Sequence, residues 1–284
     1  MIVTDNVLRS NGSPVRYVFT ETKSLADGTQ ETYLYPNGSL VMTGNDLVAN
    51  QGAGHNIIGG HGHLIAGNRF HDSTAGAQIQ GGSGGIIENN LFINNITGLL
   101  IGDMPITSEP TSGALLVRNN TIVNNSGAGI VYNATYGASV PVPNIYNNIV
   151  AYNNASGIAS VGMISNQYSF IPVDFQLARN DLFGNTLQNL NQANSWFDFV
   201  GISNPKAATK NYAGPINTSL DIFVNPIFAN MQSGDFSLGN GSSLIDAGIT
   251  SRAVPSSDFA RNLRDSNPDI GAFEFIKTSG KGKK

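Results

Sequence analysis

Apolar residues flank a pair of polar residues again and again along the first two thirds of the chain. Each copy reads as an apolar residue, any residue, Asn or a similar residue, Asn or Asp, any residue and a second apolar residue. The apolar positions alternate at a period of two, which is typical of β-strands with one buried face. Asn tolerates unusual backbone conformations and favours tight bends. Each copy therefore predicts two short strands joined by a bend at Asn.

Seven copies of this pattern lie between residues 3 and 185. The fourth position of each copy, which we call the anchor, is occupied by Asn6, Asp46, Asn68, Asn90, Asn120, Asn148 and Asp181. A further Asn usually follows four or five residues later, at Asn11, Asn50, Asn95, Asn125, Asn153 and Asn185. The smallest interval between anchors is 22 residues, and the other intervals are as long or longer. The repeat unit is therefore about 22 residues, with extra residues inserted as loops at the turns.

A unit of this length accommodates three short strands and three turns. The repeats therefore predict an all-β solenoid, a parallel β-helix, whose coils stack about 4.8 Å apart. At that distance the Asn side chains of successive coils can form a hydrogen-bonded ladder at one bend. A leucine-rich repeat would need a regular Leu framework and a helical return, and a propeller would need a period near 40 residues.

The chain resembles the right-handed parallel β-helix family, the pectate-lyase-like superfamily. Besides the repeat, the resemblance rests on the segments Ile245-Asp-Ala-Gly248 and Pro268-Asp-Ile-Gly-Ala-Phe-Glu274, an ending common among secreted bacterial members. The resemblance implies a right-handed solenoid and a location in the secreted or cell-surface fraction of a bacterium. It also implies a choice among polysaccharide lyases, glycoside hydrolases, epimerases, phage tailspikes and adhesins, which the fold alone does not make.

We expect one domain over residues 1–284. Within it, residues 12–38 are expected to form an inserted β-hairpin and residues 186–223 an irregular excursion. Residues 224–276 are expected to form the last coils and a cap over the end of the solenoid, and residues 277–284 a disordered tail. The charged residues of the cap are expected to form an ion-pair network that pins it, and they are Asp246, Arg261, Arg264, Asp269 and Glu274.

Charge and composition exclude several functions. Only 12% of the residues are charged and the net charge is −4, so no basic surface for nucleic acid is expected. No apolar run approaches the roughly 18 residues that insertion into a membrane requires. The chain has no Cys, and its first residues read as the middle of a repeat rather than as a signal peptide. We therefore expect a processed or truncated chain.

The longest insertions point to a binding groove. Residues 102–112, 133–143 and 161–175 each follow the second strand of their coil, so they are expected to stack into one wall. A groove along such a wall suits an extended polymer. The side chains expected to bind sugar hydroxyls there are Gln78, Gln80, Asn133 and Tyr136. The alternative reading is that Gln78 and Gln80 are solvated strand positions.

On another flank, the position two residues before the anchor is expected to face outward. It holds Glu88, Arg118, Tyr146 and Arg179 in successive coils. These side chains could grip an acidic sugar, but we favour a surface ladder in which Glu88 pairs with Arg118 and Tyr146 stacks on Arg179.

If the protein is an enzyme, its candidate catalytic residues are Glu88, Asp103 and Arg118. Hydrolysis of glycosides needs two carboxylates a short distance apart, and Glu88 and Asp103 are the only pair that the sequence offers at neighbouring turns. Arg118 is a candidate base for a lyase. No recognised catalytic motif accompanies them, so catalysis stays an open alternative.

No metal site or cofactor is expected. The four His residues fall within 17 positions, but they belong to strands that face different directions. Calcium is possible at exposed acids, although no Asp-rich repeat loop is present.

The sequence therefore favours an extracellular protein that recognises a polysaccharide or a cell-surface glycan. A polysaccharide lyase or glycoside hydrolase acting in the same groove, and a fragment of an adhesin or phage fibre, are the alternatives. The oligomeric state is left open.

Overall fold

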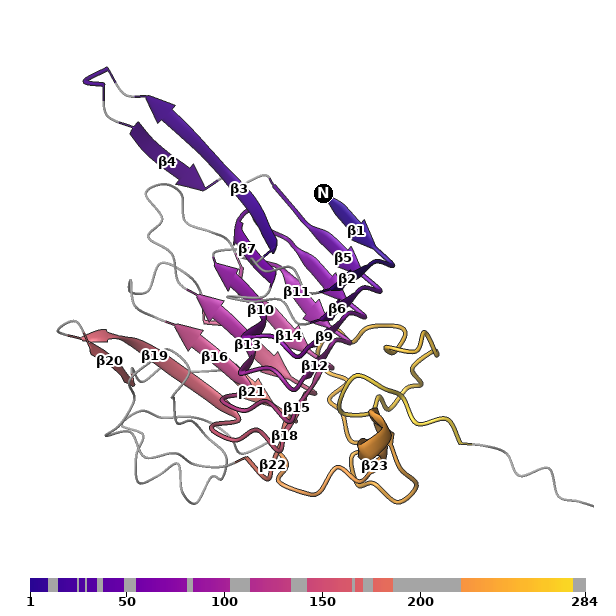
Figure 1. The fold of residues 1–284 in the computed structure, drawn as a ribbon. Helices are drawn as coiled ribbons and strands as arrows, with labels where there is room; N and C mark the ends of the chain where they lie inside the picture. Colours follow the sequence, from indigo (N-terminus) through magenta and orange to yellow (C-terminus); the bar gives the residue numbers. More distant parts are fainter. Residues whose placement is uncertain are drawn as a thin grey trace, which may run out of the picture.

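The computed structural model describes residues 1–9, 15–24, 26–28, 30–34, 38–48, 55–80, 84–102, 113–133, 142–164, 167–170, 176–185 and 221–277. These residues form a right-handed parallel β-helix built from three parallel sheets, which confirms the predicted fold class (Figure 1). The expected excursion at residues 186–223 lies outside the described residues up to residue 220, as does most of the expected tail.

The three sheets run along the length of the solenoid, and each coil contributes one strand to each sheet. Sheet A contains β1 (Ile2–Thr4), β5 (Val41–Thr43), β8 (Leu64–Ala66), β11 (Ile86–Glu88), β14 (Leu116–Arg118), β17 (Asn144–Tyr146) and β21 (Gln176–Ala178). Sheet B contains β2 (Val7–Arg9), β6 (Asp46–Val48), β9 (Arg69–His71), β12 (Leu91–Ile93), β15 (Thr121–Val123), β18 (Ile149–Ala151) and β22 (Asp181–Phe183).

Sheet C is longer and carries an antiparallel hairpin at each end. Its parallel strands are β7 (His55–Gly59), β10 (Ala75–Gln80), β13 (Thr97–Gly102), β16 (Ile130–Asn133) and β19 (Ile158–Ile164). β3 (Val15–Ser24) pairs with β7 through its first half and with β4 (Gln30–Leu34) through its second half, so the expected hairpin extends a strand of the solenoid. β20 (Gln167–Phe170) pairs with β19 at the other end.

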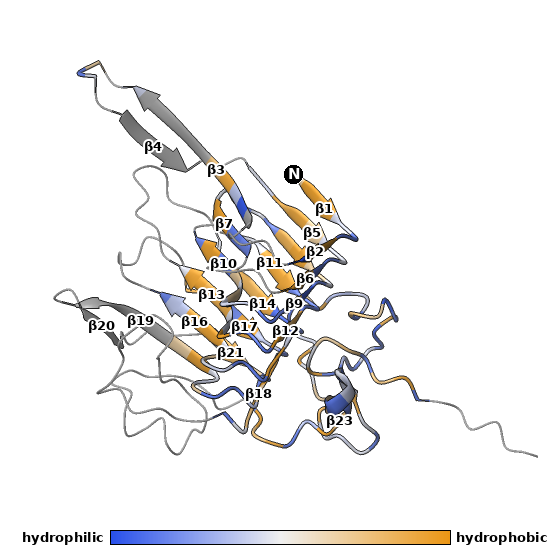
Figure 2. Cartoon of the chain, viewed as in Figure 1, coloured by the Kyte–Doolittle hydropathy of each residue, from blue (hydrophilic) through white to orange (hydrophobic). Residues whose placement is uncertain are grey.

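One core fills the inside of the coils. The middle residue of each three-residue strand points inward, as Met42, Ile65 and Ile87 do in sheet A. Phe70 and Phe92 stack on each other at 4.8 Å in sheet B. The strands are apolar and the bends between them are hydrophilic (Figure 2). The alternation in the sequence therefore predicts the inner face of the strands correctly.

The predicted Asn ladder lies at the bend between sheets A and B. The Oδ1 of each ladder residue accepts two hydrogen bonds from the ladder residue of the preceding coil, one from its backbone N–H and one from its side chain. The Nδ2 of each inner member also donates to a backbone carbonyl, as Asn90 does to Ile65. The ladder runs through Asn6, Asn45, Asn68, Asn90, Asn120, Asn148 and Asn180.

Two of the seven anchors in the sequence were placed one residue too far along. The ladder residues of those coils are Asn45 and Asn180, not Asp46 and Asp181, which begin the following strands. The ladder requires a side chain that both accepts and donates, and a carboxylate cannot donate. The left-handed conformation is also one residue earlier than expected, with φ between 51° and 69° at Asp5, Gly44, Gly67, Asn89, Asn119, Asn147 and Arg179.

A second ladder lies at the bend between sheets B and C. It runs through Ser73, Asn95, Asn125, Asn153 and Asn185, four of which are the trailing Asn residues of the repeat. Each of these residues again follows a residue with positive φ, such as Asn94 or Asn124. The expectation of a ladder at one bend was therefore incomplete, because both bends that flank sheet B contain a side-chain ladder.

Asp221 ends the first ladder. Its Oδ1 accepts from the backbone and side-chain nitrogens of Asn180, at 2.8 and 3.1 Å, as the Asn members do in the other coils. Its Oδ2 occupies the place of the donating Nδ2, is buried and has no hydrogen-bond partner. Burial is the main reason that the pKa of Asp221 is raised to about 6, although hydrogen bonds from Asn180 act in the opposite direction.

Asp221→Asn is expected to stabilise the protein increasingly as the pH rises from 4 to 7. A carboxyl with a raised pKa stabilises the fold below its unfolded pKa, and that contribution is lost as the pH rises through about 6. The gain at pH 8 should be on the order of 2 kcal/mol, since one pKa unit corresponds to about 1.4 kcal/mol. Urea unfolding at several pH values measures it. Asp235→Asn, at an exposed acid, is the control, and an equal gain at pH 4 and pH 8 would contradict the proposed cause.

Residues 221–277, which we call the C-terminal arm, run back along the outside of the solenoid (Figure 1). The arm leaves the last coil where Val224 N donates to Asp181, and it reaches the first coil where Arg261 pairs with Asp5. It contains a short antiparallel pair, β23 (Phe228–Asn230) and β24 (Asp235–Leu238). The expectation of further coils and a cap over the end of the solenoid was therefore wrong, because the arm covers a side.

The arm is held by the outer face of sheet B. Leu91, Ile93, Val123, Ile149 and Ala151 point outward from this sheet and form a second apolar core with residues of the arm, among them Phe236, Leu238, Leu244, Ile270 and Ala272. The middle residues of the same strands point into the first core. Strands buried on both faces read as continuous apolar runs, and Leu91–Ile93 is such a run. This signal in the sequence indicates a covered face.

The Asn residues with positive φ attach the arm to the bends. Asn89 Nδ2 donates to Ser257 O, Asn119 Nδ2 to Asp269 O, and Asn147 exchanges two hydrogen bonds with Ile249. In these three Asn-Asn pairs at the bend between sheets A and B, the first side chain therefore binds the arm and the second belongs to the ladder.

A buried ion-pair network lies inside the arm. Arg264 pairs with Glu274 at 2.9 Å, and it also donates to Asn89 and to the carbonyl of Gly271. Burial raises the pKa of Asp269 to about 6, although it accepts two backbone N–H groups. The expected network therefore exists around Arg264, whereas Arg261 pairs with Asp5 and Asp246 with Lys277 at the surface.

Candidate functional site

The expected groove lies along the outer face of sheet C, and the register of the strands places its residues in rows. The first row is Arg16, Asn56, Gln78, Leu100, Val131 and Ala159, which are neighbours on successive strands. The second row is Val18, Ile58, Gln80, Gly102 and Asn133. Neighbouring strands are about 4.8 Å apart, so each row presents one side chain per coil at that interval.

The two halves of this face differ in character. Towards the N-terminus, Arg16 and Val18 are exposed and Gln80 is partly exposed, while Gln78 is largely buried. Towards the C-terminus, Leu100, Val131 and Ala159 are buried, so that half presents no accessible polar row. Among the described residues of this face, the accessible polar side chains are therefore Arg16 of β3 and Gln80 of β10, with the largely buried Asn56 and Gln78 between them.

Of the side chains expected to bind sugar, Gln78 and Gln80 lie together on β10, where only Gln80 is partly exposed, and Asn133 is buried. Asp103 and Tyr136 lie outside the described residues. Most residues of the loops expected at 102–112 and 133–143 lie outside the described residues, but Gly102 and Asn133, which end β13 and β16, are paired neighbours in sheet C.

Arg16 and Asn56 also lie on this face, and neither was singled out in the sequence analysis. Asn56 lies between Arg16 and Gln78, and its Oδ1 is buried without a hydrogen-bond partner. A buried polar atom without a partner is rare in native proteins and often marks a functional site. The alternation of His55-Asn-Ile57 on β7 was the signal that could have placed Asn56 on the outer face.

The second expected flank lies beneath the arm. Glu88 and Arg118 are neighbours in sheet A and form an ion pair at 2.7 Å, while Arg118 and Tyr146 both donate to the carbonyl of Ala253 in the arm. Arg118 and Tyr146 are buried, so the expectation that they are open to solvent was wrong. Ala253 of the arm lies 135 positions after Arg118 and 107 positions after Tyr146 in the sequence.

The expected stacking of Tyr146 on Arg179 is also absent. Because the ladder residue of the last coil is Asn180, the neighbour of Tyr146 is Ala178, and the exposed Arg179 lies at the bend with a φ of 54°. Arg252 of the arm takes its place, 5.4 Å from the centroid of the Tyr146 ring.

The electrostatics of Arg118 favour a structural role over a role as a general base. Burial by itself lowers the pKa of Arg118, but the hydrogen bond to Tyr146 and the charge of Glu88 outweigh it, and the pKa is raised above its ordinary value. A general base needs a pKa near the working pH. The Glu88–Arg118 pair with its hydrogen bond to Ala253 instead ties sheet A to the arm.

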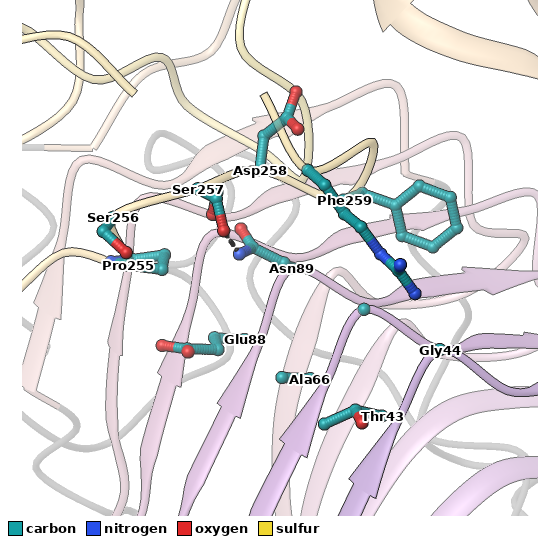
Figure 3. A pocket seen from close by; sticks show the side chains of 12 residues that line it. Thr43, Gly44, Ala66, Glu88, Asn89, Pro255, Ser256, Ser257, Asp258 and Phe259 are labelled. Atoms are coloured by element: carbon teal, nitrogen blue, oxygen red, sulfur yellow. Dashed lines mark hydrogen bonds between the residues drawn. The ribbon is translucent and has the colours of Figure 1, made fainter. Parts of the chain in front are cut away.

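Glu88 also lines an open pocket of about 370 Å³ between the bends of sheet A and the arm (Figure 3). Asn89, Ser256, Ser257 and Asp258 contribute to its walls. The Asp258 carboxylate is turned away from Glu88 in Figure 3 and accepts from Asn262 and from the backbone of Glu274. The described residues of this pocket therefore do not provide the two facing carboxylates of a glycoside hydrolase.

The histidines lie on different faces. His55 and His63 point into the first core, where burial lowers the pKa of His55 to about 4 and also lowers that of His63. Both ring nitrogens of His63 bond to backbone groups. On the outer face of sheet B, His71 lies between two carboxylates, 2.9 Å from Asp46 and 2.7 Å from Asp72.

His71 has no ring nitrogen left for a substrate or a metal ion, since each is engaged by one Asp. Within the described part of the chain, no group of three or more His, Asp or Glu side chains is arranged to hold a metal ion. None of the helices described there is long and apolar enough to cross a membrane.

Comparisons with known proteins agree with this architecture. Residues 3–171, more than half of the chain, match the family model described as the right-handed β-helix region. The fold is similar to that of a mutant of the periplasmic alginate epimerase AlgG, with a TM-score of 0.45 and 15% identity over 78% of this chain and 44% of that chain. It is also similar to pectate lyase Pel9A, with a TM-score of 0.41 and 14% identity over 96% of this chain and 87% of that chain.

The chain thus spans less than half the length of the epimerase. No curated protein sequence matches it. The match to the family model covers all the coils except the last, whose strands β21 and β22 lie beyond residue 171. The protein therefore belongs to the right-handed β-helix family.

Proposed function

We propose that the protein recognises an extended polysaccharide outside the cell and binds it along the N-terminal half of the outer face of sheet C. The observation that carries the proposal is the row formed by Arg16, Asn56 and Gln78, with Gln80 beside it. Guanidinium and amide groups donate and accept the hydrogen bonds that sugar hydroxyls require. The interval between coils is comparable with the length of one sugar unit, so a chain of sugars can follow the row.

The apolar residues beside this row support the same ligand. Val18 is exposed and Ile58 is partly exposed, and they alternate with the polar row on the same strands. Binding sites for small molecules and sugars combine apolar surface with a few polar groups that fix orientation. Asn56 Oδ1 lies in the same row, is buried and has no hydrogen-bond partner among the described residues.

Catalysis by Glu88, Asp103 and Arg118 receives less support. Glu88 and Arg118 belong to sheet A, where they bind each other and the arm, whereas the proposed sugar-binding row belongs to sheet C. A lyase or hydrolase in the groove therefore stays an alternative that the assay below also detects. A role as an adhesin or fibre fragment is compatible with binding without turnover.

The test is affinity electrophoresis in gels that contain neutral or acidic polysaccharides. The double variant Arg16→Ala/Gln80→Ala should bind the retarding polymer at least tenfold more weakly, equivalent to about 1.4 kcal/mol. Arg9→Ala/Gln232→Ala removes the same two side-chain types from exposed positions elsewhere and should bind as the wild type does. If no polymer retards the wild type, or if both double variants lose binding equally, the proposal is wrong.

The same samples are assayed for products. New ultraviolet absorbance would indicate β-elimination by a lyase, and reducing ends without absorbance would indicate a hydrolase. Retardation without either product is the expected result, because the described residues of the row contain no facing carboxylates.

A further inference from the structure

Arg252 of the C-terminal arm carries a charge that forms no ion pair with any of the described residues. Its side chain is partly buried, and its one interaction among the described residues is the contact with the ring of Tyr146 at 5.4 Å. A guanidinium group has five N–H donors in a fixed plane. A partly buried cation without an acceptor is costly, and such groups are normally paired.

The surroundings hold Arg252 in place. The ring of Tyr146 is only 2% exposed, and its hydroxyl donates to the carbonyl of Ala253, the residue next to Arg252, at 2.9 Å. Arg118 donates to the same carbonyl and is itself fixed by Glu88. The guanidinium therefore lies on a rigid ring beside a backbone that is fixed from two sides. A donor group that is ordered before binding loses little entropy when it binds a ligand.

Arg252 lines a pocket of about 250 Å³. The pocket is also lined by Arg264 and by the hydroxyl-bearing residues Thr250, Ser256 and Ser266. Glu274 neutralises Arg264, but Arg264 Nε is buried without a hydrogen-bond partner. Asp265, an exposed acid, also lines the pocket, and its Oδ1 accepts from the backbone of Asn267. The pocket therefore combines the guanidinium of Arg252 and several neutral donors with one exposed carboxylate, that of Asp265.

We propose that this pocket binds an oxyanion, either a free ion or the sulfate or carboxylate group of a larger molecule. The planar fork of Arg252 matches two oxygens of such a group, and guanidinium–oxyanion pairs of this geometry are among the stronger hydrogen-bonded contacts. The Ser and Thr hydroxyls are suited to donate to the remaining oxygens. All residues that line the pocket belong to the arm, so the site is distinct from the sugar-binding row on sheet C and does not depend on it.

Titration with sodium sulfate at constant ionic strength, followed by calorimetry, tests the proposal. The wild type should bind sulfate and Arg252→Gln at least tenfold more weakly. Arg252→Lys keeps the charge but loses the two parallel N–H donors of the guanidinium and its planar contact with the Tyr146 ring, so its affinity should be intermediate. Arg261→Gln is the matched control, because it removes the same charge from an exposed position of the arm, and its affinity should equal that of the wild type.

A second measurement on the wild type avoids any effect of substitution on folding. Phenylglyoxal modifies accessible arginines, and peptide mass spectrometry reports each site. Sulfate should protect Arg252 and leave the modification of Arg261 unchanged. Absence of sulfate binding, equal weakening in Arg261→Gln, or equal protection of both arginines would overturn the proposal.

Two polymers identify the source of the oxyanion. Binding of both free sulfate and dextran sulfate, but not of dextran, indicates a site for the group itself. Binding of dextran sulfate through Arg252, with only weak binding of free sulfate, indicates a site that recognises sulfated chains. Equal binding of dextran and dextran sulfate would show that the charge plays no part and would contradict the proposal.

Discussion

Asn120→Ala is expected to cost roughly 4 kcal/mol of stability, because each buried polar group left without a partner costs about 1–3 kcal/mol. Asn120 Oδ1 accepts from the backbone and side chain of Asn90, and Asn120 Nδ2 donates to the carbonyl of Ile87. The methyl group of Ala replaces none of these bonds. The backbone N–H of Asn90 and the carbonyl of Ile87 would then be buried and unsatisfied.

Urea unfolding followed by circular dichroism measures the loss. The matched control is Asn240→Ala, which removes the same atoms from an exposed turn and should change stability by less than about 0.5 kcal/mol. If Asn120→Ala also costs less than 1 kcal/mol, the ladder is not a main determinant of stability. A variant that accumulates only as insoluble protein, while Asn240→Ala is soluble, agrees with the expected direction.

Arg264→Met is expected to destabilise the protein by about 3–5 kcal/mol, the usual cost of removing one partner of a buried ion pair. The side chains of Arg264 and Glu274 are only 2% and 4% exposed. Met fills much of the space but leaves the Glu274 carboxylate, the Asn89 amide oxygen and the Gly271 carbonyl without this donor. Because Asn89 belongs to the solenoid, the arm should also detach more easily.

The control is Arg261→Met, which breaks an ion pair with Asp5 whose side chains are 79% and 67% exposed. Such surface pairs contribute about 0–1 kcal/mol. The double variant Arg264→Met/Glu274→Gln should recover part of the loss, since it removes the uncompensated charge. Limited proteolysis should cleave the arm of Arg264→Met sooner than that of Arg261→Met. Equal losses in both single variants would refute the role of burial.

The register errors at Asp46 and Asp181 could have been avoided from the sequence. In both coils an Asn precedes the Asp, and only the amide can both accept and donate in the ladder. The outward position of Asn56 on β7 could also have been read from the alternation of that strand. These errors came from the application of the pattern, and the information was present in the chain.

The burial of Arg118 and Tyr146 could not have been predicted from local patterns. Both occupy outward positions of their strands, as the spacing predicts, but the arm that covers them is distant in the sequence. The apolar run Leu91–Ile93 indicates that some segment covers sheet B, although it does not identify the segment. The position of Arg252 has the same origin, because the Tyr146 ring that it contacts belongs to a coil far away in the sequence.

The sequence by itself determined the solenoid, its coil length and its Asn ladder. Each coil has the same local requirements, so the same pattern of apolar and Asn residues occurs seven times in the sequence. Only the tertiary structure decided which outward face stays open. The arm docks on the solenoid through apolar contacts and single hydrogen bonds between residues far apart in the chain. The solenoid side of these contacts repeats from coil to coil, but their partners on the arm follow no period, so the repeat pattern does not identify them.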